Sequence, residues 1–273
     1  MLNNILCPTD FSSVASNALT FAIDLCKKAN ATLHILHVQN IPIVDVNYPM
    51  DNYQAFIEQA ESFTDENFKA LESKTLLPSQ IKYKTHKTIG SFVSNAIIDF
   101  TEKNSVDLII MGTTGASGIE SVLIGSNAAS VVGKSEVPVF VIPPSVTSTG
   151  FKHILYSSDY NEPEFPTLSQ LKYFADLYHA DITVLHVATE SDHYFDIEGS
   201  FFVKNKKELG DVQLVTVENM EITDAINQQI ETHQIDMVVL AKHNRGFFDR
   251  LFHRSFSKQM TYHTTTPLLV LNK

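Results

Sequence analysis

The sequence predicts an α/β fold in which one unit, a parallel sheet with helices packed on it, occurs twice along the chain. Its 273 residues exceed the usual length of one domain, and 44% of them are hydrophobic, enough for a substantial core. Short β-branched segments alternate with amphipathic segments of helix length, which favours parallel strands joined by right-handed crossovers. The second half of the chain repeats the first.

The internal repeat consists of four segments that recur in the same order. The matched pairs are Asn4–Asp10 with His153–Asp159, Leu33–Val38 with Ile182–Val187, Val106–Met111 with Ile235–Leu240, and Val137–Ile142 with Thr266–Leu271. The first two pairs are 149 residues apart and the last two 129, so the second copy is shorter by twenty residues in between. The segment Pro143–Gly150 has the composition of a linker, which predicts domains at residues 1–146 and 151–273.

The first copy contains five expected strands with helices between them. The strands are Asn4–Cys7, Thr32–Val38, Ile81–His86, Asp107–Gly112 and Val139–Pro143. Apolar residues recur every three or four positions over residues 13–29, 55–71 and 92–100, which is the period of an amphipathic helix. We expect residues 39–53 to form a mobile connection or lid. In the second copy, the shortened segment 188–211 leaves room for one short helix at most.

Composition and charge exclude several functional classes. The formal net charge of −11 argues against a nucleic-acid-binding surface, which needs a basic stripe. No apolar run approaches the roughly 18 residues of a membrane span, and the start of the chain lacks the regions of a signal peptide. The two cysteines, Cys7 and Cys26, fit reduced thiols better than a disulfide framework. We therefore expect a cytoplasmic location.

A glycine-rich loop follows the fourth strand of the first copy. Gly112, Gly115, Gly118 and Gly125 lie within fourteen residues, and Asn127–Lys134 after them can be helical. Glycine permits positive φ and close approach of the backbone to a ligand, and unpaired N–H groups at a helix start suit a phosphate. The loop therefore predicts nucleotide binding. It is neither a P-loop, because no Gly-Lys-Ser/Thr follows, nor a G-x-G-x-x-G fingerprint.

The spacing Gly-x2-Gly-x9-Gly-Ser-Asn, from Gly112 to Asn127, resembles the ATP-binding signature of the universal stress protein family. The opening Ile5–Asp10, the second strand ending at Val38 and the Val-Pro-Val start of the fifth strand resemble that family too. The resemblance covers both halves. It implies, in each half, a doubly wound five-stranded sheet of order 3-2-1-4-5, of the adenine nucleotide alpha hydrolase-like kind. It also implies that the two fifth strands meet and that the halves pack as a pseudo-dimer.

The resemblance further implies a nucleotide site in the first copy. The residues implied are Pro8, Thr9 and Asp10 at the adenosine, Val38 beside the adenine, Gly112, Thr114 and Gly115 along the ribose and phosphates, and Gly125, Ser126 and Asn127 at the phosphates. ATP is the expected ligand, with AMP and ADP as alternatives, and magnesium is expected with the nucleotide. Sheet topology leads to the same place, because ligands bind at the carboxyl ends of strands where the winding reverses.

Some of these residues have a structural alternative. Asp10 could cap the helix that starts near Ser12, and Ser126 could cap the next helix while also binding phosphate. The glycines could serve only a tight turn. His34 and His37 suggest a metal pair, but on a strand they face opposite sides, so no metal site is expected. His37 matches His186, which indicates a structural place shared by both copies.

The second copy departs from the signature. Alignment at Ser255 puts Ala241, Asn244 and Arg254 where the first copy has glycines, and these side chains block close backbone approach. We therefore expect no nucleotide there. The loop from Lys242 to Arg254 is instead basic and contains interleaved apolar residues. It is either a solvated face or a site for an anion or a partner.

The same residues argue for binding without efficient catalysis. Fast phosphoryl transfer needs a cation at the γ-phosphate and a placed base, but no Lys or Arg occurs between Lys103 and Lys134. We expect no catalytic residue and at most a weak ATPase. The favoured function is an ATP-binding stress-response or signalling module with an unknown protein partner, and the alternative is a nucleotide-independent interaction or small-ligand module. An ATP pyrophosphatase would need a Ser-Gly-Gly loop where Pro8, Thr9 and Asp10 stand. Whether two chains form a homodimer stays open.

Overall fold

The computed structural model describes residues 1–40, 50–113, 125–158, 165–188, 210, 212–218, 221–242 and 265–272. Contacts divide the described residues into two compact units, one up to Val137 and one from Pro138 onward. The fifth strand of the first sequence copy therefore belongs, by its contacts, to the second unit. Each unit is described by itself below.

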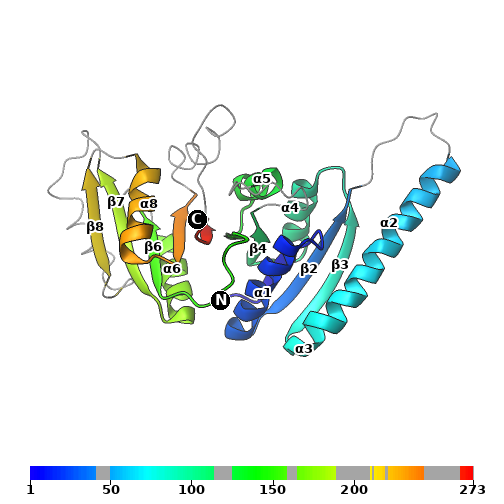
Figure 1. Ribbon diagram of the computed structural model, residues 1–273, viewed down its shortest axis with the longest axis horizontal. Helices are drawn as coiled ribbons and strands as arrows, with labels where there is room; N and C mark the ends of the chain where they lie inside the picture. The colour runs from blue at the N-terminus through cyan, green and yellow to red at the C-terminus, as the bar shows by residue number, and fades with distance from the viewer. Residues whose placement is uncertain are drawn as a thin grey trace. The chain divides into compact units, whose positions relative to one another are not determined.

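The first unit contains a parallel sheet with the strand order β3-β2-β1-β4 (Figure 1). In chain order its elements are β1 (Asn4–Pro8), α1 (Ser13–Ala29), β2 (Thr32–Gln39), α2 (Met50–Leu71), a π-helical turn (Glu72–Leu76), α3 (Leu77–Ser79), β3 (Lys82–Ile89), α4 (Val93–Lys103), β4 (Leu108–Gly112) and α5 (Ser126–Lys134). The alternation of strands and helices predicted from the sequence is confirmed. Because neighbouring strands are parallel, β1 and β4 end at the same edge of the sheet.

Helix α1 covers the predicted range, and its ends have identifiable causes. The hydroxyl of Ser12 accepts a hydrogen bond from the N–H of Ala15 at 3.2 Å, so Ser12 is the N-cap. The suggestion that Asp10 caps this helix is therefore wrong. At the other end, Asn30 adopts a left-handed conformation (φ 52°) and donates its N–H to the carbonyl of Cys26. The apolar residues that predicted the helix form its buried face against the sheet.

Helix α2 begins earlier than predicted, at Met50 instead of Ala55, so part of the expected mobile connection is helical. Gln39, at the start of that expected connection, is the last residue of β2, and its side chain is buried. Residues 41–49 lie outside the described residues. The helix runs alongside β3 (Figure 1). It is joined to β3 by an ion pair of 2.9 Å between Lys87 and Asp65.

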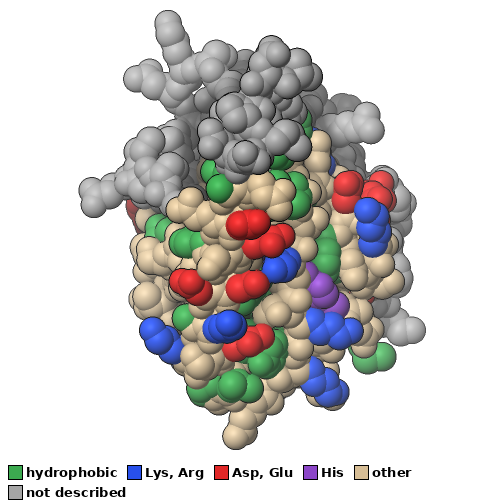
Figure 2. Space-filling view, turned by 90° about the vertical axis from the view of Figure 1, so that its right-hand side faces the viewer, with side chains coloured by type: hydrophobic (Ala, Val, Ile, Leu, Met, Phe, Trp, Pro, Cys, Tyr) green, Lys and Arg blue, Asp and Glu red, His purple; other side chains and the backbone are tan. Residues whose placement is uncertain are grey.

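Strand β3 contains several lysines. Among the described strands it pairs only with β2. Lys82, Lys84 and Lys87 are all exposed along it. On the face that Figure 2 shows, acidic and basic side chains are interspersed among scattered apolar ones. Charged side chains on a strand of this kind disfavour pairing with the strand of another chain.

The second unit repeats the same topology. Its elements are β5 (Val139–Ile142), β6 (His153–Ser157), α6 (Phe165–Tyr178), β7 (Asp181–Ala188), β8 (Gln213–Glu218), α8 (Ile222–His233), β9 (Met237–Ala241) and β10 (Leu268–Leu271). The parallel order β8-β7-β6-β9-β10 corresponds to 3-2-1-4-5 of the second copy. β5 pairs with β10 in the antiparallel sense, so the predicted meeting of the two fifth strands is confirmed. Most of the shortened segment, residues 189–209 and 211, lies outside the described residues.

The duplication extends to individual hydrogen bonds. The carboxylate of Asp107 accepts from the backbone N–H groups of Asn3 and Asn4 at 2.6 and 2.9 Å. In the second copy, the carboxylate of Asp236 accepts from the N–H groups of Lys152 and His153 at 2.8 and 3.1 Å. Both aspartates thus join the start of the first strand to the start of the fourth. The equivalence of the two copies therefore extends beyond their apolar strands.

Candidate functional site

A cavity of about 290 Å³ lies in the first unit, at the edge of the sheet where β1 and β4 end. Three segments supply most of its wall: the β1–α1 connection, the end of β4 and the start of α5. The lining residues are Pro8, Thr9, Asp10, Ala15, Leu36, Val38, Val93, Ile97, Met111, Gly112, Thr113, Gly125, Ser126, Asn127 and Ala128. The cavity is therefore at the carboxyl ends of two parallel strands, where ligands of doubly wound sheets bind.

The β1–α1 connection is fixed by backbone hydrogen bonds. The N–H of Thr9 donates to the carbonyl of Leu36 at 2.9 Å, and the carbonyl of Thr9 accepts from Nδ1 of His37 at 2.8 Å. Asp10 is exposed, and one of its carboxylate oxygens accepts from the N–H of Ser12 at 3.0 Å. Thr9 is thus bonded to β2 through both its N–H and its carbonyl, and the carboxylate of Asp10 is oriented at the rim of the cavity.

The start of α5 forms the polar end of the cavity. Gly125 is the N-cap, with φ −61° and ψ 155°, and its N–H donates to the carbonyl of Thr113. Ser126 is the first helical residue, so the suggestion that it caps this helix is wrong. The first N–H groups of a helix have no intrahelical acceptor and carry the positive end of the helix dipole. This end of the cavity can therefore bind an anion.

Apolar side chains form another part of the wall. Leu36 and Val38 project from β2, and Val93 and Ile97 from α4. Leu36, Val38 and Ile97 are buried, with at most 8% of each exposed. A wall of this kind suits a flat apolar group such as an aromatic base. The cavity thus has apolar side chains and the start of a helix in the same lining.

Gly112 has a structural reason that the sequence reasoning missed. A Cβ built on it would lie 2.5 Å from Cγ1 and 3.2 Å from the carbonyl oxygen of Val14. The close approach that this glycine permits is therefore by helix α1. Positive φ is not involved either, since Gly112 does not adopt it and Gly125 has φ −61°. The expectation that these two glycines serve positive φ is wrong.

Eight of the ten sequence-predicted site residues line this one cavity. They are Pro8, Thr9, Asp10, Val38, Gly112, Gly125, Ser126 and Asn127. The other two, Thr114 and Gly115, lie outside the described residues. Of the apolar wall, sequence reasoning predicted Val38 and missed Leu36, Val93 and Ile97. The spacing of Leu36 and Val38 on a strand, and of Val93 and Ile97 on a helix, indicates that each pair shares a face.

The side chains that line the cavity carry little charge. Asp10 is the only carboxylate among them, and none is a lysine or an arginine. In the part of the chain that the structure describes, no group of three or more His, Cys, Asp or Glu side chains could hold a metal ion. The described lining residues thus supply no positive side chain to a ligand in the cavity.

The two histidines of β2 have different partners. Nε2 of His34 donates to Oδ1 of Asn4 at 3.2 Å, and Nδ1 lies 3.1 Å from Nε2 of His86. Burial, followed by the charges of His86 and Lys84, lowers the pKa of His34. The tie from His37 to Thr9 recurs in the second copy, where Nδ1 of His186 donates to the carbonyl of Ser158 at 3.0 Å. The shared structural place of His37 and His186 is confirmed.

Comparison with known proteins identifies the family. The model of the universal stress protein family matches this chain twice, over residues 1–143 and 150–272. The chain belongs to the universal stress protein family. Its two matches make it a tandem member.

Relatives of this universal stress protein match it by halves or over its whole length. Universal stress protein MJ0531 of Methanocaldococcus jannaschii is 31% identical over 144 residues, which are 52% of this chain and 82% of the relative. YxiE of Bacillus subtilis is 26% identical over 151 residues, 52% of this chain and 99% of the relative. A solved universal stress protein from Archaeoglobus fulgidus covers 99% of this chain and 96% of its own, with a TM-score of 0.73 and 20% identity. That structure shares the tandem fold.

The second repeat of this universal stress protein differs where the first has Gly112. Ala241 ends β9 at that position and is buried. The N–H of the next residue, Lys242, donates to the carbonyl of Leu271 at 2.9 Å. The remainder of the basic loop, residues 243–254, lies outside the described residues, so its role stays a prediction. Among the described residues, no helix has both the length and the hydropathy to cross a bilayer.

Proposed function

We propose that the first repeat binds an adenine nucleotide and that the second repeat does not. The observation that carries this proposal is the single cavity that joins the apolar wall at Val38 to the start of α5 at Ser126. A base and a phosphate need these two environments within one site. The Gly-x2-Gly-x9-Gly-Ser-Asn spacing supports the same ligand class. ATP, ADP and AMP all present these groups.

Magnesium is proposed to enter with ATP. The lining residues supply no positive side chain, and Asp10 supplies the one carboxylate. Magnesium is commonly held by one or two carboxylates together with substrate phosphates, so Asp10 fits one position in its coordination. The ion would neutralise the phosphates. AMP, with fewer charges, should depend less on it.

Hydrolysis is proposed to be slow or absent. Phosphoryl transfer needs a placed base or water and a positive group at the γ-phosphate. The only carboxylate among the lining residues, Asp10, is exposed at the rim and accepts from the N–H of Ser12. A nucleotide held without turnover suits a cytoplasmic stress-response or signalling module whose nucleotide state is read by a protein partner.

The test uses an asparagine at each of two helix starts. Asn127 is the second residue of α5 and lines the cavity, whereas Asn95 is the third residue of α4 and does not. An acidic residue in the first helical turn is stabilising, so Asn127→Asp and Asn95→Asp should both fold. Asn95→Asp also keeps the acceptor for Lys134.

Calorimetry should show that wild-type protein and Asn95→Asp bind AMP equally. Two unit charges about 4 Å apart repel by about 1 kcal/mol even in water, and a phosphate dianion doubles this to about 2 kcal/mol. Asn127→Asp should therefore weaken binding of AMP by up to roughly 30-fold. Adenosine, which lacks the phosphate, should bind all three proteins alike. If the wild-type protein ignores every adenine nucleotide with magnesium present, the nucleotide-independent interaction module becomes the better description.

A further inference from the structure

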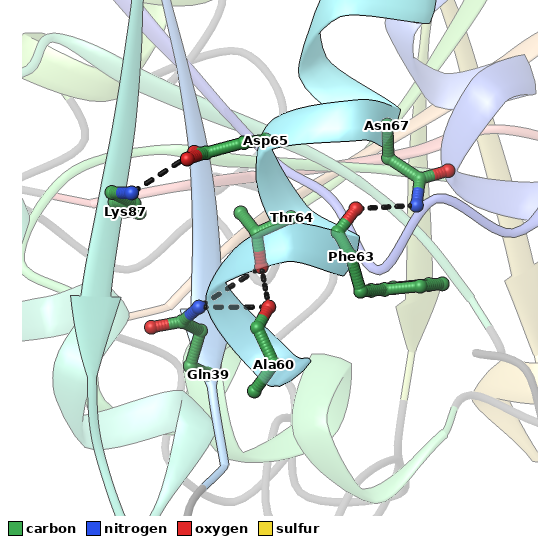
Figure 3. A network of polar contacts seen from close by, with 7 residues as sticks. All are labelled: Gln39, Ala60, Phe63, Thr64, Asp65, Asn67 and Lys87. Atoms are coloured by element: carbon green, nitrogen blue, oxygen red, sulfur yellow. Dashed lines mark hydrogen bonds and ion pairs between the residues drawn. The ribbon is translucent and has the colours of Figure 1, made fainter. Parts of the chain in front are cut away.

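Helix α2 is tied to two segments that line the cavity. One tie is made by Gln39, which directly follows the cavity residue Val38. Its buried side-chain amide donates to the carbonyl of Ala60 at 3.2 Å and to the hydroxyl of Thr64 at 3.0 Å (Figure 3). The other tie is made by Phe11, which directly follows the cavity residue Asp10. Gln39 and Phe11 thus both contact α2, and each directly follows a residue that lines the cavity.

Phe11 has an unusual backbone conformation. Its φ is 62°, in the left-handed region that bulky side chains rarely adopt. Such a conformation persists only where the surroundings hold it in place. The N–H of Phe11 donates to the hydroxyl of Thr9 at 3.0 Å, so this conformation also fixes the turn that carries Asp10.

Aromatic packing holds Phe11 in this conformation. Its ring centroid lies 4.7 Å from that of His37 on β2 and 5.2 Å from that of the buried Phe68 on α2. The ring centroid of Phe63, on the same helix, lies 6.2 Å away, and the two rings are at 77° to each other. His37 contributes twice, because it also donates to the carbonyl of Thr9. The ring is therefore held between β2 and α2.

We propose that Phe11 is a positioning residue for the nucleotide site and that it couples the β1–α1 connection to the docking of α2. This inference rests on the proposed function. Phe11 is not among the residues that line the cavity. It therefore acts through its neighbours Thr9 and Asp10, which do line the cavity. Coupling between two sites is reciprocal. Nucleotide binding therefore holds α2 more firmly, and release of α2 weakens nucleotide binding.

The experiment compares Phe11→Ala, Phe11→Tyr and Phe56→Ala with the wild-type protein. Phe56 is a matched control, because it lies on α2 with 42% of its surface exposed. Affinity for ATP with magnesium is measured by calorimetry. Loss of the aromatic contacts in Phe11→Ala should weaken binding by about tenfold. Phe11→Tyr retains a ring and should stay within about twofold of the wild-type protein, as should Phe56→Ala.

Hydrogen exchange supplies a readout that a purely structural role of Phe11 would not move. In the wild-type protein and in Phe56→Ala, ATP should slow exchange of the α2 amides from Thr64 to Leu71. In Phe11→Ala the slowing should be much smaller, even at ATP concentrations that saturate the variant, because only the tie through Gln39 remains. This difference would show that the helix senses the ligand through Phe11.

The failure of this inference can be told apart from the failure of the proposed function. If the wild-type protein binds ATP and Phe11→Ala binds it with equal affinity and equal protection of α2, the positioning role is wrong. If Phe11→Ala does not fold, Phe63→Ala replaces it, since Phe63 is 55% exposed and contacts the same ring. Unchanged affinity and protection in Phe63→Ala would then overturn the inference. Absence of binding of every adenine nucleotide to the wild-type protein would overturn the proposed function and this inference together.

Discussion

Replacing Gly112 by alanine should destabilise the first unit even without a ligand. The new Cβ would lie 2.5 Å from Cγ1 of Val14, closer than the roughly 3 Å minimum for such contacts. Valine strongly prefers one χ1 rotamer in a helix, so this methyl group cannot easily move away. Overpacking of this kind costs about 1–3 kcal/mol, partly offset by about 0.4–1 kcal/mol from the lower chain entropy of unfolded alanine. A net loss of about 1–2 kcal/mol is expected.

Urea unfolding of two pairs of proteins measures this effect. Gly133→Ala is the control, because a Cβ at that helical glycine would meet nothing within 4 Å and alanine is the better helix former. It should be as stable as the wild-type protein or more stable. In a Val14→Ala background, where the clashing methyl group is gone, Gly112→Ala should cost less. Full stability of Gly112→Ala, or an equal loss in both backgrounds, would refute the packing explanation.

Three further predictions concern groups outside the cavity. Burial is the main cause that lowers the pKa of both His34 and His86, so the unfolded chain takes up protons before the folded chain as the pH falls below 6.5. The free energy of unfolding should therefore fall as the pH is lowered below 6.5. It should fall less steeply in the double variant His34→Gln, His86→Gln. Burial raises the pKa of Cys7 and Cys26 to about 12, so mass spectrometry should find neither thiol alkylated by iodoacetamide at pH 8 until urea is added, and fast labelling of the folded protein would contradict this. Lys87→Ala removes an exposed ion pair, so its midpoint of urea unfolding should stay close to that of the wild-type protein, and a clearly lower midpoint would point to a role beyond that pair.

Much of the fold could be predicted because local periodicity and the repeat agree with it. The range of α1 follows from apolar spacing, and Asn30 ends it through a left-handed cap. The repeat predicted equivalent strands, and the bonds of Asp107 and Asp236 show that the equivalence reaches single atoms. These features depend on residues that are close in sequence or on the repetition of a segment, so they can be predicted from the sequence.

The candidate site was predicted less completely, because several of its residues owe their roles to distant contacts. Gly112 has to be a glycine because Val14 leaves no room for a Cβ, and Val14 is almost a hundred residues away in the chain. Ser12 caps α1 in place of Asp10, although both are good cap residues. Which of them is the cap depends on the residue at which the helix begins after β1. The φ of Phe11 depends on rings from α2 and β2, and no local pattern indicates it.

The hydrogen bond from His37 to Thr9 has an equivalent in His186 and Ser158, within a repeat that has Ala241 at the Gly112 position. An imidazole near the end of the second strand therefore holds the residue that follows the first strand in both repeats, with or without a glycine at the end of the fourth strand. In other chains built on this repeat, a histidine found there would report on the scaffold. Taken alone, it would be misleading as a marker of metal or nucleotide chemistry.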